Sequence, residues 1–122
     1  MNQANRKGLR YEDQAREYLQ SQGLRLLAQN FSSRCGEIDL IMRDRDTICF
    51  IEVKFRKSMA YGGAASSIPL SKQRKIVKTA LFYLAGHKRL ASQPLRFDAL
   101  LIQHQPDGSE QVDWIQNAFY AE

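Results

Sequence analysis

The sequence predicts an α/β fold in which helices flank a mixed β-sheet. Two observations support this: short runs rich in β-branched and aromatic residues alternate with two longer segments of helical periodicity, and turn residues separate most of them. A chain of 122 residues with 43% hydrophobic and 25% charged residues is also typical of a globular protein. We therefore expect residues 1–122 to form a single domain.

The first half of the chain predicts one helix and three strands. Over residues 5–22, Tyr11, Ala15 and Leu19 recur at helical spacing, and Gly23 is a suitable helix end. Residues 24–31 fit a first strand. Residues 37–43 and 48–55 fit two more, joined as a hairpin by the polar loop 44–47.

The second half predicts a helix and one or two strands. Ser71 is placed to cap a helix that runs to Ala85 and ends at Gly86. We expect its buried stripe to consist of Ile76, Val77, Ala80, Leu81 and Leu84. Residues 95–103 read as a strand that completes a right-handed β-α-β crossover, and residues 111–116 as a further edge strand. The predicted order is therefore αβββαβ, with one additional strand.

The central hairpin carries an unusual set of charges within apolar strands. If Arg43 pairs with Ile48 across the loop, Asp39 lies opposite Glu52, and Glu37 opposite Lys54. Opposed carboxylates repel unless a cation lies between them, and Mg²⁺ or Mn²⁺ together with a phosphate would compensate both charges. A surface hairpin with ordinary salt bridges is the alternative. A register shift of one residue would destroy the predicted metal site.

Positive charge is concentrated in one block beside this hairpin. Residues 53–97 contain ten Lys or Arg and no acidic residue, whereas residues 98–122 contain no Lys or Arg. Such a block indicates a surface that faces a polyanion, most simply nucleic acid, although a solvated basic face remains an alternative. The candidate nucleic-acid-binding residues are Arg56, Lys57, Lys72, Arg74, Lys75 and Lys78.

Two further polar residues are candidates for the same site. Glu12 lies at the edge of the first helix's apolar stripe, where it could face the sheet or bend into water. Gln73 lies on the apolar stripe of the second helix, where its amide needs a partner. That partner could be the strand bearing Glu52, a phosphate or metal-bound water beside that strand, or the local backbone.

Other classes of protein are disfavoured. No apolar run approaches the ~20 residues of a membrane helix, and the N-terminus lacks the apolar stretch of a signal peptide. Cys35 and Cys49 lack the spacing and the histidine partners of a zinc site. These features favour a cytoplasmic protein without a membrane partner.

The combined motifs resemble those of a known family. Asp39 followed by Glu52-x-Lys54 is similar to the core motif of the PD-(D/E)xK nuclease superfamily, with Ile38 in place of the proline. The segments 36–41, 50–56, 71–73 and 96–98 together resemble the YraN family. That family comprises small bacterial proteins, largely uncharacterised, whose fold is like that of archaeal Holliday-junction resolvases.

The resemblance implies a restriction-endonuclease-like fold and a set of roles. Asp39 and Glu52 match the metal-binding acids, and Glu12 matches the acidic residue that the first helix often contributes, so the implied metal-binding set is Asp39, Glu52 and Glu12. Lys54 matches the lysine that orients the attacking water, and Gln73 matches a glutamine of resolvase-like members.

Three functions are compatible with these residues. The favoured one is a Mg²⁺-dependent endonuclease acting on DNA. Branched or junction DNA is suggested by analogy alone, and junction cleavage would require two active sites and hence a homodimer. The second is a nucleic-acid-binding module whose nuclease site is inactive or depends on a partner. The third is an interaction subunit in which the charges are purely structural.

Overall fold

The computed structural model describes residues 11–56 and 68–121 of the chain. In order, its elements are α2 (Tyr11–Ser21), β1 (Arg25–Ser33), β2 (Gly36–Asp44), β3 (Thr47–Arg56), α4 (Leu70–Ala85), the 3₁₀ turn η2 (Lys88–Leu90), β4 (Leu95–His104) and β5 (Glu110–Phe119). The predicted α/β class and the order αβββαβ are confirmed, and β5 is the additional strand. Residues 5–10 of the predicted first helix lie outside the described residues.

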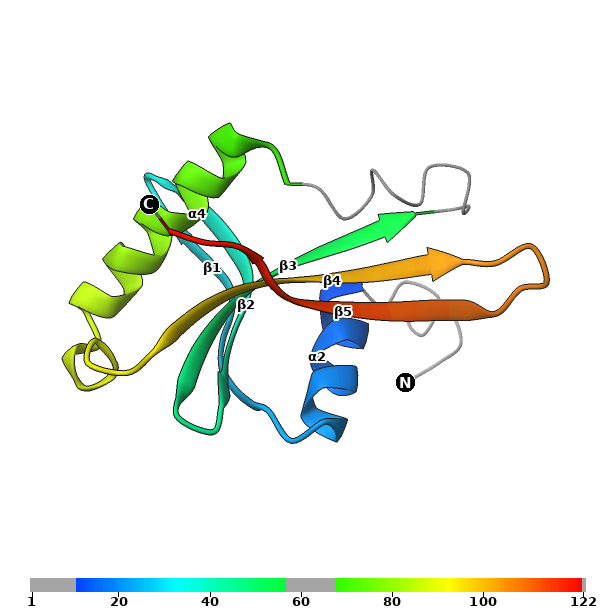
Figure 1. Cartoon of the computed structure of the whole chain (residues 1–122), viewed down its shortest axis with the longest axis horizontal. Coiled ribbons are helices and arrows are strands. Elements are labelled where there is room, and N and C mark those ends of the chain that lie inside the picture. The colour runs from blue at the N-terminus through cyan, green and yellow to red at the C-terminus, as the bar shows by residue number, and fades with distance from the viewer. Residues whose placement is uncertain (1–10, 57–67, 122) are drawn as a thin grey trace.

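The five strands form one mixed sheet in the order β1-β2-β3-β4-β5. Strands β1 to β3 form an antiparallel meander, β3 and β4 are parallel, and β5 returns antiparallel to β4. Figure 1 shows α4 on one face of the sheet and α2 on the other. Because α4 lies between β3 and β4 in the chain, the predicted β-α-β unit is present.

The core consists of two apolar layers, one on each face of the sheet. Phe50 and Phe97 pack with Tyr83 of α4, whereas Ile51 and Leu100 pack with Leu19 of α2. Successive residues of a strand point to opposite faces, so every second residue of β3 after Phe50 points toward the α4 side. That alternation brings Glu52 and Lys54 onto the α4 face of the sheet.

Helix α4 differs from the prediction in its cap and in its buried stripe. It begins at Leu70 with Pro69 at the N-cap position, where the Gln73 N–H donates to the Pro69 carbonyl at 2.9 Å. Ser71 is therefore inside the first turn and is not the cap. Leu81 is 58% exposed. The stripe is centred on Ile76, Ala80 and Tyr83, so Leu81 projects away from the sheet.

The central hairpin is tighter than predicted. Asp44 pairs with Thr47, which leaves a two-residue turn of Arg45 and Asp46 instead of a four-residue loop. Arg45 adopts a positive φ of 59°, as such tight turns require.

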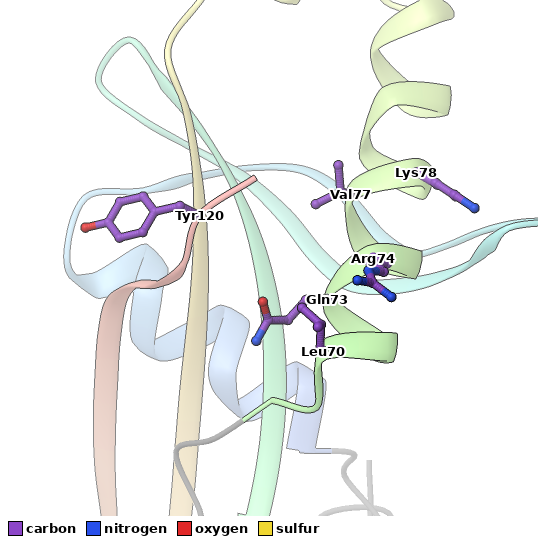
Figure 2. Close-up of a pocket in the computed structure, with 6 residues that line it drawn as sticks. All are labelled: Leu70, Gln73, Arg74, Val77, Lys78 and Tyr120. Atoms are coloured by element: carbon purple, nitrogen blue, oxygen red, sulfur yellow. The ribbon is translucent and has the colours of Figure 1, made fainter. Parts of the chain in front are cut away.

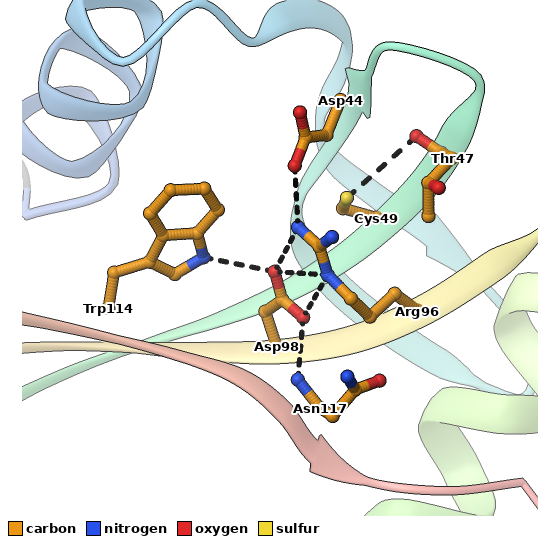
Figure 3. A network of polar contacts seen from close by, with 7 residues as sticks. All are labelled: Asp44, Thr47, Cys49, Arg96, Asp98, Trp114 and Asn117. Atoms are coloured by element: carbon orange, nitrogen blue, oxygen red, sulfur yellow. Dashed lines mark hydrogen bonds and ion pairs between the residues drawn. The ribbon is translucent and has the colours of Figure 1, made fainter.

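A buried polar network joins three strands at the turn end of this hairpin (Figure 3). Asp98 is fully buried, and it accepts hydrogen bonds from Arg96 Nε at 2.9 Å and Trp114 Nε1 at 3.0 Å. The Asn117 N–H donates to the same carboxylate at 3.1 Å, and Arg96 also reaches Asp44 at 3.1 Å. The network therefore compensates a buried charge and ties β2, β4 and β5 together.

Within the described residues, no helix combines the length and the apolar character needed to cross a bilayer.

Candidate functional site

The candidate site lies where the backbone pairing between β2 and β3 ends. Arg43 pairs with Ile48 as predicted, and the ladder continues to Leu40 opposite Ile51. The expected next pairs, Asp39 with Glu52 and Glu37 with Lys54, are not part of this ladder. The register is therefore correct, but the prediction of directly opposed pairs beyond Leu40 is wrong.

Beyond the last backbone pair, Leu40 with Ile51, the Asp39 side chain connects β2 to β3. Its Oδ2 accepts a hydrogen bond from the Val53 N–H at 2.8 Å. On the neighbouring strand β1, Asn30 has a positive φ of 54°, between the paired residues Gln29 and Phe31. Because the β3 backbone itself binds the carboxylate, Asp39 is fixed beside the residue that follows Glu52.

The two acids line one small pocket together with the start of α4. The pocket encloses about 210 Å³. Its lining residues come from β2, β3 and α4: Gly36, Glu37, Asp39, Glu52, Lys72, Lys75 and Ile76. Glu52 is only 7% exposed, whereas Glu37 at the rim is exposed. Two of the three predicted metal-binding acids, Asp39 and Glu52, therefore meet in a shared cavity.

The electrostatics of this pocket favour a bound cation. Burial, reinforced by the negative charge of Glu52, raises the pKa of Asp39 from 3.8 to about 7. The ammonium of Lys72 forms an ion pair with Glu52 Oε2. In this structure the lysine supplies the positive charge that a pair of neighbouring carboxylates requires.

Lys54 follows Glu52 on the same face of β3. Burial, together with the positive charges of Arg56 and Lys72, lowers its pKa from 10.5. The positive charges of Arg56 and Lys72 thus both repel the ammonium of Lys54. Their mutual repulsion would be relieved by an anion such as a phosphate.

Glu12 occupies the first turn of α2, on the other side of the sheet from α4. Its negative charge contributes to the raised pKa of Asp39, after burial and the larger effect of Glu52. Glu12 is therefore within electrostatic reach of the predicted site. It is half-buried and does not line the carboxylate pocket.

Gln73 is not brought to the carboxylates. Its Nε2 donates to the carbonyl of Ile68 at 2.7 Å, which is the local backbone partner left open by the sequence. Gln73 instead lines a separate groove on α4.

The predicted nucleic-acid-binding residues divide between the flanks of α4. Lys72 and Lys75 line the carboxylate pocket, whereas Arg74 and Lys78 line the groove on the other flank. Arg74, Lys75 and Lys78 are all exposed, and of these three only Lys75 lines the carboxylate pocket. Arg56 ends β3 and donates to the carbonyl of Phe55 at 3.0 Å. Lys57 lies outside the described residues.

Two contributors to the site were missed in the sequence. The ion pair of Lys72 with Glu52 joins a helix to a strand twenty residues earlier, and no local pattern signals it. Gly36 has a φ of +151°, and an added Cβ would lie 3.2 Å from the Thr79 hydroxyl. The sequence does contain a signal for this contact, because a glycine within a strand often marks a close approach of two segments.

Among the described residues, no three His, Cys, Asp or Glu side chains form a ready-made metal cage. Two carboxylates are nevertheless enough for Mg²⁺, which commonly completes its coordination with water and substrate phosphate. The hard oxygen donors of Asp39 and Glu52 therefore fit such an ion.

Comparisons with known proteins agree with the motifs. A UPF0102 protein of Psychromonas ingrahamii is 52% identical over 117 residues, which covers 95% of this chain and 91% of the relative. A UPF0102 protein of Nitrosomonas europaea is 47% identical over 119 residues, and one of Stutzerimonas stutzeri is 42% identical over 119 residues; each alignment covers 98% of both chains. The model of the uncharacterised protein family UPF0102 matches residues 11–102. This chain therefore belongs to family UPF0102, the YraN family.

Proposed function

We propose that this protein is a metal-dependent nuclease that hydrolyses phosphodiester bonds in nucleic acid, with DNA as the favoured substrate. The observation that carries the proposal is the pocket shared by Asp39 and Glu52, in which Asp39 has a pKa of about 7. Keeping two acids together in a partly buried pocket is costly for a purely structural surface. Strongly perturbed carboxylates in a cleft are typical of catalytic sites.

The metal would be Mg²⁺ or Mn²⁺, held by Asp39 and Glu52, with Glu12 adding negative charge from α2. Bound there, it would supply a Lewis acid that polarises the phosphodiester. The hydrogen bond from the Val53 N–H orients the Asp39 carboxylate before any ligand arrives.

The chain's own cations would act on the phosphate. Lys54 follows Glu52 on the same face of β3, so its ammonium would stabilise the negative charge that develops on the phosphate oxygens. Lys72 and Lys75 line the same pocket from α4 and would hold the nucleic-acid backbone without reading its sequence. Lys72 would exchange its partner Glu52 for a phosphate when the metal binds.

One observation favours a second candidate function. The Lys72 ammonium already pairs with Glu52, so the pocket is partly neutralised by the protein itself. A nucleic-acid-binding module that needs no metal would have such an arrangement. The two candidates differ in whether Asp39 is required for cleavage.

The test is a nuclease assay on single-stranded, duplex, flapped and branched DNA, with Mg²⁺ or Mn²⁺ compared with EDTA. Wild type is compared with Asp39→Asn and Lys54→Ala. Asp46→Asn is the matched control, because Asp46 is an exposed acid in the turn at the other end of the same hairpin. We expect metal-dependent cleavage that both site variants lose and that Asp46→Asn retains.

Two results would contradict the proposal. Cleavage that persists in Asp39→Asn would place the activity elsewhere or in a contaminant. Absence of cleavage on every substrate, with wild-type nucleic-acid binding intact, would favour the binding module.

A further inference from the structure

A second groove runs along α4 on the flank that faces away from the carboxylates. It encloses about 380 Å³ and is lined by Leu70, Gln73, Arg74, Val77, Lys78 and Tyr120. Figure 2 shows Leu70, Gln73 and Val77 on the side of α4 toward the end of β5, while Arg74 and Lys78 lie along the outer side of the helix. The Tyr120 ring points away from α4 in this view. Helix α4 supplies five of the six lining residues, and Tyr120 follows the end of β5.

The chemistry of this groove differs from that of the carboxylate pocket. It contains two cations and an amide, and no acidic residue is among its described lining residues. Leu70 is 54% exposed, and Val77, on the same side of α4, is half-buried. A volume of this size can hold a nucleotide-sized ligand. Cations bordering an exposed apolar floor suit phosphates together with the faces of unpaired bases.

The two sites are separated by the width of one helix. Lys72 and Lys75 line the carboxylate pocket, whereas Arg74 and Lys78 border the groove, so cationic residues lie on both flanks of α4. An α-helix with its side chains is about 10–12 Å across. A strand in the groove would therefore be held apart from any phosphate bound at Asp39 and Glu52.

We propose that this groove binds an unpaired nucleic-acid strand, with phosphates on Arg74 and Lys78 and bases against Leu70 and Val77. The proposal rests on the proposed function for the identity of the ligand, and it adds a subsite that binds a strand without cutting it. Duplex bases are stacked and paired, so their faces cannot reach the apolar floor. The groove should therefore discriminate single strands from duplexes.

The charge test measures binding by fluorescence anisotropy in EDTA, with a labelled single strand and a labelled blunt duplex. Arg74→Glu/Lys78→Glu is compared with Lys88→Glu/Arg89→Glu, an exposed pair in η2 that gives the same change in net charge. We expect the groove pair to weaken single-strand binding roughly tenfold more than the control pair, because it also removes direct phosphate contacts. Equal losses in the two variants would overturn the proposal.

The apolar test distinguishes an unpaired strand from a duplex. Leu70→Ser should weaken single-strand binding about fivefold and leave duplex binding unchanged, in keeping with the energies of base contacts. Leu81→Ser is the matched control, because Leu81 is 58% exposed on the same helix outside the groove, and it should change neither. An equal effect of Leu70→Ser on both ligands, or no effect on either, would refute the unpaired strand as occupant.

Neither binding test depends on cleavage. If the groove variants lose their preference for single strands and wild type cleaves no substrate, the groove is supported and the nuclease is rejected. Metal-dependent cleavage with unchanged binding in the groove variants would reject the groove and support the nuclease.

Discussion

Replacing Asp39 by Asn should make the metal-free protein more stable at alkaline pH. The pKa of Asp39 is about 7 in the folded protein and 3.8 in an unperturbed carboxyl, mainly because of burial and the charge of Glu52. Between these values the folded state holds a proton that the unfolded state has lost, so stability falls as the pH rises from about 4 to about 7. Above pH 7, the resulting loss in the free energy of unfolding is at most about 4 kcal/mol.

We expect about half of that limit to be measurable, since Asp39 is only half-buried and solvent screens its charge. Asn has nearly the same shape, and its carbonyl can still accept the Val53 N–H. In EDTA, Asp39→Asn should therefore raise the free energy of unfolding by about 2 kcal/mol at pH 8 and by almost nothing at pH 4.5.

The assay is urea denaturation of both proteins in EDTA across this pH range, repeated with Mg²⁺. Taking the difference between the two proteins cancels every other titrating group. Mg²⁺ should stabilise wild type at pH 8 but leave the Asn variant unchanged. Equal or lower stability of Asp39→Asn at pH 8 would refute the idea that this carboxylate is held at a cost, and Asp46→Asn should show no pH-dependent gain.

The remaining predictions concern the surroundings of the pocket and the buried network. Gly36→Ala should lower the free energy of unfolding by about 1–3 kcal/mol and reduce nuclease activity, because Gly36 has a φ of +151° and the added Cβ would meet Thr79. The control in the same thermal denaturation assay is Gly108→Ala, which has a φ of +92° and open space around it and therefore measures the backbone strain alone. Lys72→Met should destabilise the protein in EDTA and enlarge its stabilisation by Mg²⁺, because Glu52 loses its cationic partner. Lys75→Met is the control and should change neither quantity when unfolding is measured with and without the metal. Asp98→Asn should cost about 3 kcal/mol or more in urea denaturation while leaving the increment due to Mg²⁺ unchanged, because the Arg96 network lies at the other end of the hairpin.

The fold was predictable because its signals are local. In the described part of the chain, helical periodicity located both α-helices, and runs of β-branched and aromatic residues located the five strands. The polar loop fixed the hairpin register in which Arg43 pairs with Ile48. The errors fell where tertiary contacts decide. The N-cap of α4 is Pro69 and not the predicted Ser71. Leu81 faces outward because the helix packs on the sheet along Ile76, Ala80 and Tyr83.

The site was predictable as a set of residues but not as an arrangement. Alternation along β3 correctly placed Glu52 and Lys54 on one face. The end of the ladder at Leu40, the bond from Val53 to Asp39 and the pairing of Lys72 with Glu52 depend on how strands and helix meet in space. The Gln73 amide donates to the backbone carbonyl of Ile68, just before α4 begins. A polar residue in the apolar stripe therefore marked the start of the helix and not a member of the carboxylate site.

The hydrogen bond between the Val53 amide and Asp39 makes one backbone position a spectroscopic reporter of the pocket. An amide proton that donates to a carboxylate experiences a different field when that carboxylate is neutral, ionised or bound to a metal. The NMR resonance of Val53 should consequently shift with the ionisation of Asp39 near pH 7 and again on addition of Mg²⁺. Because β3 is the central strand of the sheet, this reporter lies in a rigid part of the molecule, and its signal can follow the chemistry of the site independently of unfolding.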